Sequence, residues 1–167
     1  MKTSVKLLIV SLAASVALGA CGRFLDTQGP QLAADIPSIP DTETFAKSLG
    51  VNISTMKRTT NGVYYSDTRV GTGAQVDSAV PVVIDYAIYL KDGTFIASNQ
   101  QSPLNMLQAV PGLTEGMLGS GVSGGGMREG GVRLIVVPSE LGYANVGFGH
   151  IPPNATIVYN VQLDQIP

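Results

Sequence analysis

The sequence predicts an α+β fold in which an antiparallel sheet is accompanied by one short helix. Beyond Thr59 the chain consists of short runs of β-branched and aromatic residues separated by turn residues, a pattern typical of antiparallel strands. The segment Lys91-Asp92-Gly93 supplies a tight turn between two of these runs, with glycine where a positive φ is needed. Within this region only the stretch beginning near Leu113-Thr114-Glu115-Gly116-Met117 favours a helix.

Five runs are the expected strands: Gly62–Asp67, Val80–Leu90, Thr94–Ala97, Val132–Val137 and Thr156–Leu163. The second run alternates, so that one side of its strand carries an apolar stripe made of Val82, Ile84, Tyr86, Ile88 and Leu90. The segment after the expected helix, Leu118–Gly126, is rich in Gly and Ser. Its three consecutive glycines, Gly124–Gly126, predict a mobile loop.

Residues 1–20 have the features of a signal peptide. Lysines precede an apolar run, Leu7–Leu18, which is too short to cross a bilayer as a helix. Leu18 breaks the small-residue rule of ordinary secretory cleavage sites, whereas Leu18 followed by two small residues and Cys21 resembles the lipoprotein signals of bacteria.

This resemblance implies that the chain is cleaved before Cys21 and acylated on the sulfur and the new amino terminus. The expected location is the envelope of a bacterium, with the outer membrane facing the periplasm favoured over the inner membrane. The alternative is plain secretion, with Cys21 left as a free thiol.

Composition limits the chemistry that the secreted part can carry out. Removal of residues 1–20 leaves 147 residues, enough for one domain with a core and a tail. Eight basic residues against twelve acidic ones give this part a net charge of −4, which argues against nucleic acid as a partner. Cys21 is the only cysteine and His150 the only histidine, so we expect no disulfide, no metal centre and no cofactor.

Residues 21–58 are expected to form the lipidated N-terminus and a tether, followed by the folded domain at 59–167. Pro37 and Pro40 oppose a continuous helix and favour extended backbone. A short helical pattern near Thr42–Leu49 leaves open a second interpretation, in which this part is a small helical dimerisation segment.

Several stretches match a known family in type and in order. They are Thr60–Tyr65 followed by Gly71-Thr72-Gly73, Tyr86 with Leu90–Thr94, Val110–Gly112 with Glu115–Met117, Met127 with Glu129–Gly131, and Arg133–Tyr143 followed by Ile151–Val161. Together they resemble the FKBP-type peptidyl-prolyl isomerases. The resemblance implies a twisted antiparallel half-barrel sheet wrapped around one short helix, with an apolar pocket between them.

The same resemblance implies the residues of the site. It assigns catalytic roles to Tyr143, whose hydroxyl would bond a substrate carbonyl, and to Tyr86. It assigns substrate binding to Ile96, Val110, Leu113, Ile151 and Tyr159. The alternative for the tyrosines is that they only build the core, as aromatic residues on alternating strands commonly do.

Several pocket positions depart from the family. After the Asp-Gly turn relatives have Phe-Asp-Ser-Ser, whereas this chain has Ile96-Ala97-Ser98-Asn99. The family's pocket tryptophan aligns with Leu113, and a further pocket aromatic aligns with Leu104. Each lost ring removes contact worth on the order of 1 kcal/mol, at about 25 cal/mol per Å². We therefore expect weakened catalysis and poor binding of the macrolide inhibitors typical of the family.

The expected function is prolyl cis-trans isomerisation that assists the folding of exported envelope proteins. Unfolded chains wait tens of seconds for X-Pro bonds to isomerise, so the expected partners are unfolded or partly folded proline-containing proteins. The lipid bilayer is the other expected partner, through acylated Cys21. Two alternatives are a non-catalytic prolyl-binding or chaperone-like lipoprotein with a drifted pocket, and a purely structural lipoprotein.

Overall fold

The computed structural model of the chain describes residue 39 and residues 43–167. The predicted signal peptide, residues 1–20, and the predicted lipidation site, Cys21, lie outside the described residues. The regular elements are, in chain order, the 3-10 turns η1 (Lys47–Leu49) and η2 (Ile53–Thr55), the strands β1 (Lys57–Arg58), β2 (Tyr64–Arg69), β3 (Pro81–Leu90) and β4 (Phe95–Asn105), the helix α1 (Pro111–Leu118), the strand β5 (Val132–Val137), the 3-10 turn η3 (Ser139–Leu141) and the strand β6 (Ile157–Gln165).

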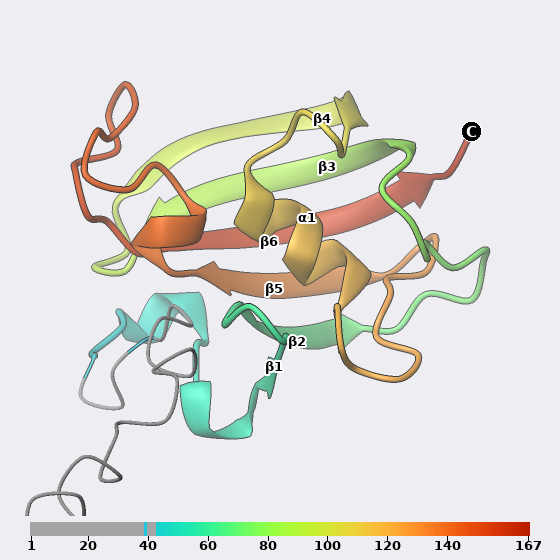
Figure 1. The fold of residues 1–167 in the computed structure, drawn as a ribbon, viewed down its shortest axis with the longest axis horizontal. Helices are drawn as coiled ribbons and strands as arrows, with labels where there is room; N and C mark the ends of the chain where they lie inside the picture. Colours follow the sequence, from blue (N-terminus) through green and yellow to red (C-terminus); the bar gives the residue numbers. More distant parts are fainter. Residues whose placement is uncertain (1–38, 40–42) are drawn as a thin grey trace, which may run out of the picture. The chain divides into compact units, whose positions relative to one another are not determined.

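The strands form one six-stranded sheet in the order β1-β2-β5-β6-β3-β4, and every neighbouring pair is antiparallel. Helix α1 lies across one face of this sheet (Figure 1). The sheet does not close, because β1 and β4 remain its two edges. The predicted fold, an open antiparallel sheet around one short helix, is therefore confirmed. Within the described residues, no helix has the length and apolar character needed to cross a membrane.

The main core fills the space between α1 and the sheet. Leu113 and Met117 of the helix pack against strand residues that include Ile135, Ile157 and Leu163. The apolar stripe predicted for β3 also faces this core, with Val82 and Ile84 fully buried. Pairing of β3 with both β4 and β6 places this stripe opposite the helix.

Strand β4 is longer than the predicted run Thr94–Ala97. It continues to Asn105 and pairs with β3 over nearly its whole length. The run from Ser98 to Ser102 is polar on both faces, because β4 is an edge strand whose residues are mostly exposed. The pairing register shifts between Ile84 and Tyr86. Periodicity alone therefore did not indicate this half of the strand.

The part of the predicted tether that the structure describes packs against the sheet. We call residues 43–56 the N-terminal strap. Its apolar side chains, Phe45, Leu49, Val51, Ile53 and Met56, cover a second cluster of buried residues on the face opposite α1: Ile39, Leu134, Val136 and Val158. The Glu43 carboxylate accepts hydrogen bonds from Lys91 Nζ at 2.9 Å and from the Thr156 hydroxyl at 3.0 Å. The described residues before 59 thus belong to the same compact unit as the sheet, and the expected domain boundaries stay a prediction.

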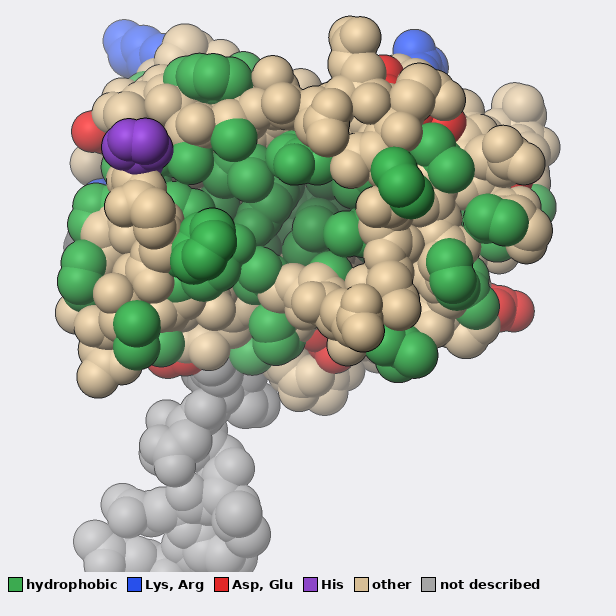
Figure 2. Space-filling model, turned by 90° about the horizontal axis from the view of Figure 1, so that it is seen from above, with side chains coloured by type: hydrophobic (Ala, Val, Ile, Leu, Met, Phe, Trp, Pro, Cys, Tyr) green, Lys and Arg blue, Asp and Glu red, His purple; other side chains and the backbone are tan. Residues whose placement is uncertain are grey.

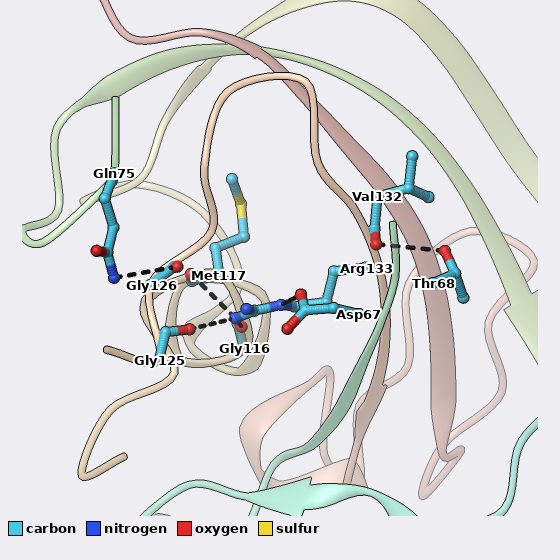
Figure 3. A network of polar contacts seen from close by, with 9 residues as sticks. All are labelled: Asp67, Thr68, Gln75, Gly116, Met117, Gly125, Gly126, Val132 and Arg133. Atoms are coloured by element: carbon cyan, nitrogen blue, oxygen red, sulfur yellow. Dashed lines mark hydrogen bonds and ion pairs between the residues drawn. The ribbon is translucent and has the colours of Figure 1, made fainter. Parts of the chain in front are cut away.

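One buried charge joins three elements of the fold. Arg133 of β5 is 2% exposed and forms an ion pair with Asp67 of β2, with 2.7 Å between Nε and Oδ1. Its Nη1 donates to the carbonyl oxygens of Gly116, at 2.8 Å, and Gly125, at 2.7 Å (Figure 3). The guanidinium also lies 4.1 Å from the ring centre of Tyr65.

These bonds hold the end of α1 and the segment that follows it. Gly116 is in the last turn of the helix, where carbonyl groups lack partners within the helix. Gly125 and Gly126 lie in the segment predicted to be mobile, but their carbonyl oxygens accept hydrogen bonds from Arg133 and from Gln75 Nε2, the latter at 3.2 Å. Gly125 and Gly126 are therefore bonded to the packed structure, and the mobility expected of this segment stays a prediction.

We expect Arg133→Met to lower the free energy of unfolding by about 3 to 5 kcal/mol, because Asp67 and the buried carbonyl groups would lose their charged partner. Urea titration measures this difference. Arg128→Met is the matched control, since Arg128 is exposed and its bonds to Gly73 and Gln75 lie at the surface. An Arg133→Met protein as stable as its control would contradict this account of the network.

Candidate active site

A pocket of about 260 Å³ lies between α1, the sheet and the loops at one end of the molecule. Figure 2 looks onto this end and shows a hollow with a largely hydrophobic wall. The lining residues are Ile84, Tyr86 and Ile88 of β3, Ser102 and Leu104 of β4, Gln108, Ala109 and Val110 of the following loop, Leu113 of α1, Tyr143, and Tyr159 of β6.

Local structure explains why these side chains meet. Alternation along β3 puts its apolar stripe on the face toward α1. Val110 precedes the helix in extended conformation, and Pro111 at the first helical position turns the chain so that Leu113 faces the sheet. Tyr159 is 2% exposed and pairs with Ile88 and Ile135 across the sheet. The pocket lining therefore combines the aliphatic side chains of Ile84, Leu104 and Leu113 with tyrosine rings.

Three tyrosine hydroxyls supply polar groups to this apolar pocket. Burial raises the pKa of Tyr159 above its usual value of 10, and the neighbouring hydroxyls of Tyr143 and Tyr86, with a side-chain hydrogen bond to Tyr143, raise it further. A tyrosine hydroxyl can both donate and accept a hydrogen bond, so these groups could bind a carbonyl oxygen.

Five of the seven predicted site residues line the pocket: Tyr86, Val110, Leu113, Tyr143 and Tyr159. Ile96 and Ile151 do not line it. Ile96 packs against the main core from β4, and its short branched side chain does not extend to the cavity as an aromatic ring could. Ile151 is 5% exposed, and its side chain fills the core beneath the adjoining loop. The functional roles assigned to all seven residues remain predictions.

Sequence reasoning missed several residues at the site. Ile84 and Ile88 share the strand face of Tyr86, so the alternation of β3 already carried the signal. Ser102 was missed because its strand was predicted too short. Phe148 was also missed, although its ring stacks on Tyr143 with 5.1 Å between ring centres and 14° between planes. Its only sequence signal is an aromatic residue between two glycines.

The lining of the site is suited to binding an apolar group. Among the described residues, no three His, Cys, Asp or Glu side chains come together in a way that could hold a metal ion. His150, the only histidine, is exposed in the loop beyond the pocket. What the pocket does provide is an apolar cavity with hydroxyl donors, which suits an uncharged ring next to a carbonyl group.

Comparison with known proteins gives the same family throughout. Residues 73–164 match the family described as FKBP-type peptidyl-prolyl cis-trans isomerase. The chain is 39% identical over 111 residues to the chloroplastic peptidyl-prolyl cis-trans isomerase FKBP16-4 of Arabidopsis thaliana, covering 62% of this chain and 47% of that protein. It is 33% identical over 109 residues to an FK506-binding protein of Neisseria meningitidis, covering 61% of this chain and 94% of that protein.

A solved structure shows the same arrangement of elements. The crystal structure of FkpA from Escherichia coli superposes with a TM-score of 0.58 at 29% sequence identity. The match covers 66% of this chain and 50% of the FkpA chain. The chain thus spans about half the length of FkpA and of the Arabidopsis protein, and nearly the whole length of the Neisseria protein.

We expect the stability of the protein to fall above pH 10, partly because of Tyr159. The pKa of this residue is raised in the folded state, so the unfolded chain loses the proton first. The stability that neutral Tyr159 contributes is therefore complete below pH 10 and is lost as the pH rises toward the folded-state pKa. Urea midpoints at pH 8 and pH 11 should differ less for Tyr159→Phe than for the parent. An equal loss in both proteins would contradict this prediction.

Proposed function

We propose, since the chain belongs to the family of FKBP-type peptidyl-prolyl cis-trans isomerases, that the pocket described above is where X-Pro bonds rotate. The observation that carries the proposal is an apolar cavity with the tyrosine side chain of Tyr143 in its wall. The substrates are segments of unfolded or partly folded proteins that contain proline. Metal and cofactor play no part in the proposed mechanism.

The physical task of such a site follows from the peptide bond. Rotation is opposed by resonance, with a barrier of about 18 to 20 kcal/mol, whereas the cis and trans forms of X-Pro differ by only about 1 kcal/mol. The transition state is a twisted amide, and a site accelerates rotation by binding this form more tightly than the planar one. No covalent bond has to form or break.

The described residues can meet this requirement. The aliphatic floor made by Ile84, Leu104 and Leu113 would receive the prolyl ring and keep water away from the amide. The Tyr143 hydroxyl would donate to a neighbouring carbonyl oxygen and hold the peptide while the amide twists. By the family resemblance, Leu104 and Leu113 replace aromatic rings. The pocket floor therefore fits a prolyl ring less closely, and we expect turnover to be modest.

We expect Tyr143→Phe to lower the turnover of an X-Pro peptide about tenfold, since a hydrogen bond in such a site is worth about 1 to 1.5 kcal/mol. Cis-to-trans relaxation of the peptide with purified protein measures this. Tyr89→Phe is the matched control, because Tyr89 packs on the opposite face of the sheet, against Phe95.

Two outcomes would count against the proposal. A parent protein that relaxes the peptide no faster than the uncatalysed reaction would contradict isomerase activity and favour the alternative of a non-catalytic prolyl-binding module. An active parent whose turnover is unchanged by Tyr143→Phe would contradict the role of that hydroxyl while leaving the activity in place.

We also propose that the protein works at the envelope of a bacterium, anchored to a bilayer through acylated Cys21, on exported client proteins. The support is the sequence of residues 1–21, with its basic start, its apolar run and its only cysteine after two small residues. Several acyl chains would give stable anchoring, which one chain alone does not give.

Expression of the full chain in a bacterium supplied with labelled palmitate tests the anchor. We expect the label in the protein and the protein in the membrane fraction, with both lost in Cys21→Ser. A parent protein that carries no label and is released with the soluble periplasmic proteins would contradict the anchor.

A further inference from the structure

We propose that Phe148 is a positioning residue that holds the ring of Tyr143, and thereby its hydroxyl, in place at the pocket. The inference rests on the proposed function, because it concerns the hydroxyl that we assign to the substrate carbonyl. It adds a residue that lies outside the lining of the pocket and outside the stretches that carry the family resemblance.

The two rings are stacked almost parallel. Their centres lie 5.1 Å apart and their planes differ by 14°. Phe148 is nevertheless 67% exposed, whereas Tyr143 is half-buried and lines the pocket. An aromatic ring left mostly in water gains little from burial. Its contact with Tyr143 is thus the main interaction that the ring makes in this position.

The loop fixes Phe148 relative to the core. The backbone N–H of Phe148 donates to the Ile151 oxygen at 2.9 Å, and the Ile151 N–H donates to the Phe148 oxygen at 2.8 Å. Gly149, with φ of +57°, makes the tight turn between them. Because the side chain of Ile151 is buried in the main core, this small hairpin is anchored, and the ring of Phe148 is held with it.

The same loop is tied to Tyr143 on its other side. The N–H of Gly147 donates to the Tyr143 oxygen at 3.1 Å, with Gly147 at φ of +71°. A Cβ at Gly147 would lie 2.6 Å from the Ile151 oxygen, so only glycine fits this path of the backbone. Backbone hydrogen bonds between Phe148 and Ile151 and between Gly147 and Tyr143 therefore place the Phe148 ring over Tyr143.

This arrangement limits the positions that the Tyr143 ring can take. Phe148 stacks on one face of the ring, and Tyr159 belongs to the same pocket lining as Tyr143. Without Phe148 the ring could rotate toward solvent, and the hydroxyl would spend less time where a substrate carbonyl can reach it. Catalysis is sensitive to such losses of orientation.

Kinetics of Phe148 variants of the full chain test the inference. We expect Phe148→Ala to lower kcat for an X-Pro peptide about three- to tenfold, the range that an aromatic pair is worth, with KM little changed. Phe148→Tyr keeps the stack and should restore turnover, whereas Phe148→Leu should not. Val146→Ala is the matched control, because Val146 belongs to the same loop and is 81% exposed.

A double-mutant cycle separates positioning from direct contact with substrate. If Phe148 acts through the Tyr143 hydroxyl, Phe148→Ala should cause almost no further loss in a Tyr143→Phe background. Thermal unfolding should be unchanged in Phe148→Ala, since the ring is mostly exposed. Equal losses in both backgrounds would overturn the inference.

The failure of this inference differs from the failure of the proposed function. An active parent whose kcat survives Phe148→Ala would overturn the inference alone. A parent protein that does not accelerate relaxation would overturn the proposed function, and the inference with it.

Discussion

The structure depends on how the buried charge of Arg133 is satisfied. Taking a guanidinium out of water costs several kcal/mol, so the residue is stable at 2% exposure only while its donors have partners. Those partners come from β2, from the end of α1 and from the glycine-rich segment, and all three must be in place together. Fixing the end of α1 also fixes Leu113, which forms part of the pocket floor. A structural ion pair thus determines where the site can form.

Both faces of the sheet are covered, one by α1 and the main core and the other by the N-terminal strap. On β5, Ile135 and Val137 face α1 and the main core, whereas Leu134 and Val136 face the N-terminal strap. The strap is fastened by Glu43 to Lys91 and Thr156. Since the strap covers the face away from the pocket, the pocket remains open to a peptide. The outer face contributes stability and the inner face contributes the site.

Alternation made β3 predictable, and the helix was expected as one short stretch. Five of the residues indicated by the family resemblance line the pocket. The rest depended on contacts between distant parts of the chain. The strap consists of short 3-10 turns joined by irregular backbone and so has no periodic signal, although its apolar residues cover Leu134, Val136 and Val158. Ile151 was placed in the pocket by its position before Pro152, but the turn at Gly149 directs its side chain into the core. The same turn brings Phe148 onto Tyr143, which is visible only in three dimensions.

The most direct test of the claim that X-Pro bonds rotate in this pocket is a variant whose fluorescence reports whether a peptide is bound there. The chain contains no tryptophan, so Leu113→Trp introduces a single indole at the pocket floor, at the position where the family resemblance implies a tryptophan. If X-Pro bonds rotate in this pocket, turnover should rise and the fluorescence should change as an X-Pro peptide is added, with the same half-saturation as catalysis. Turnover that saturates while the indole fluorescence stays constant would show that the reaction takes place elsewhere.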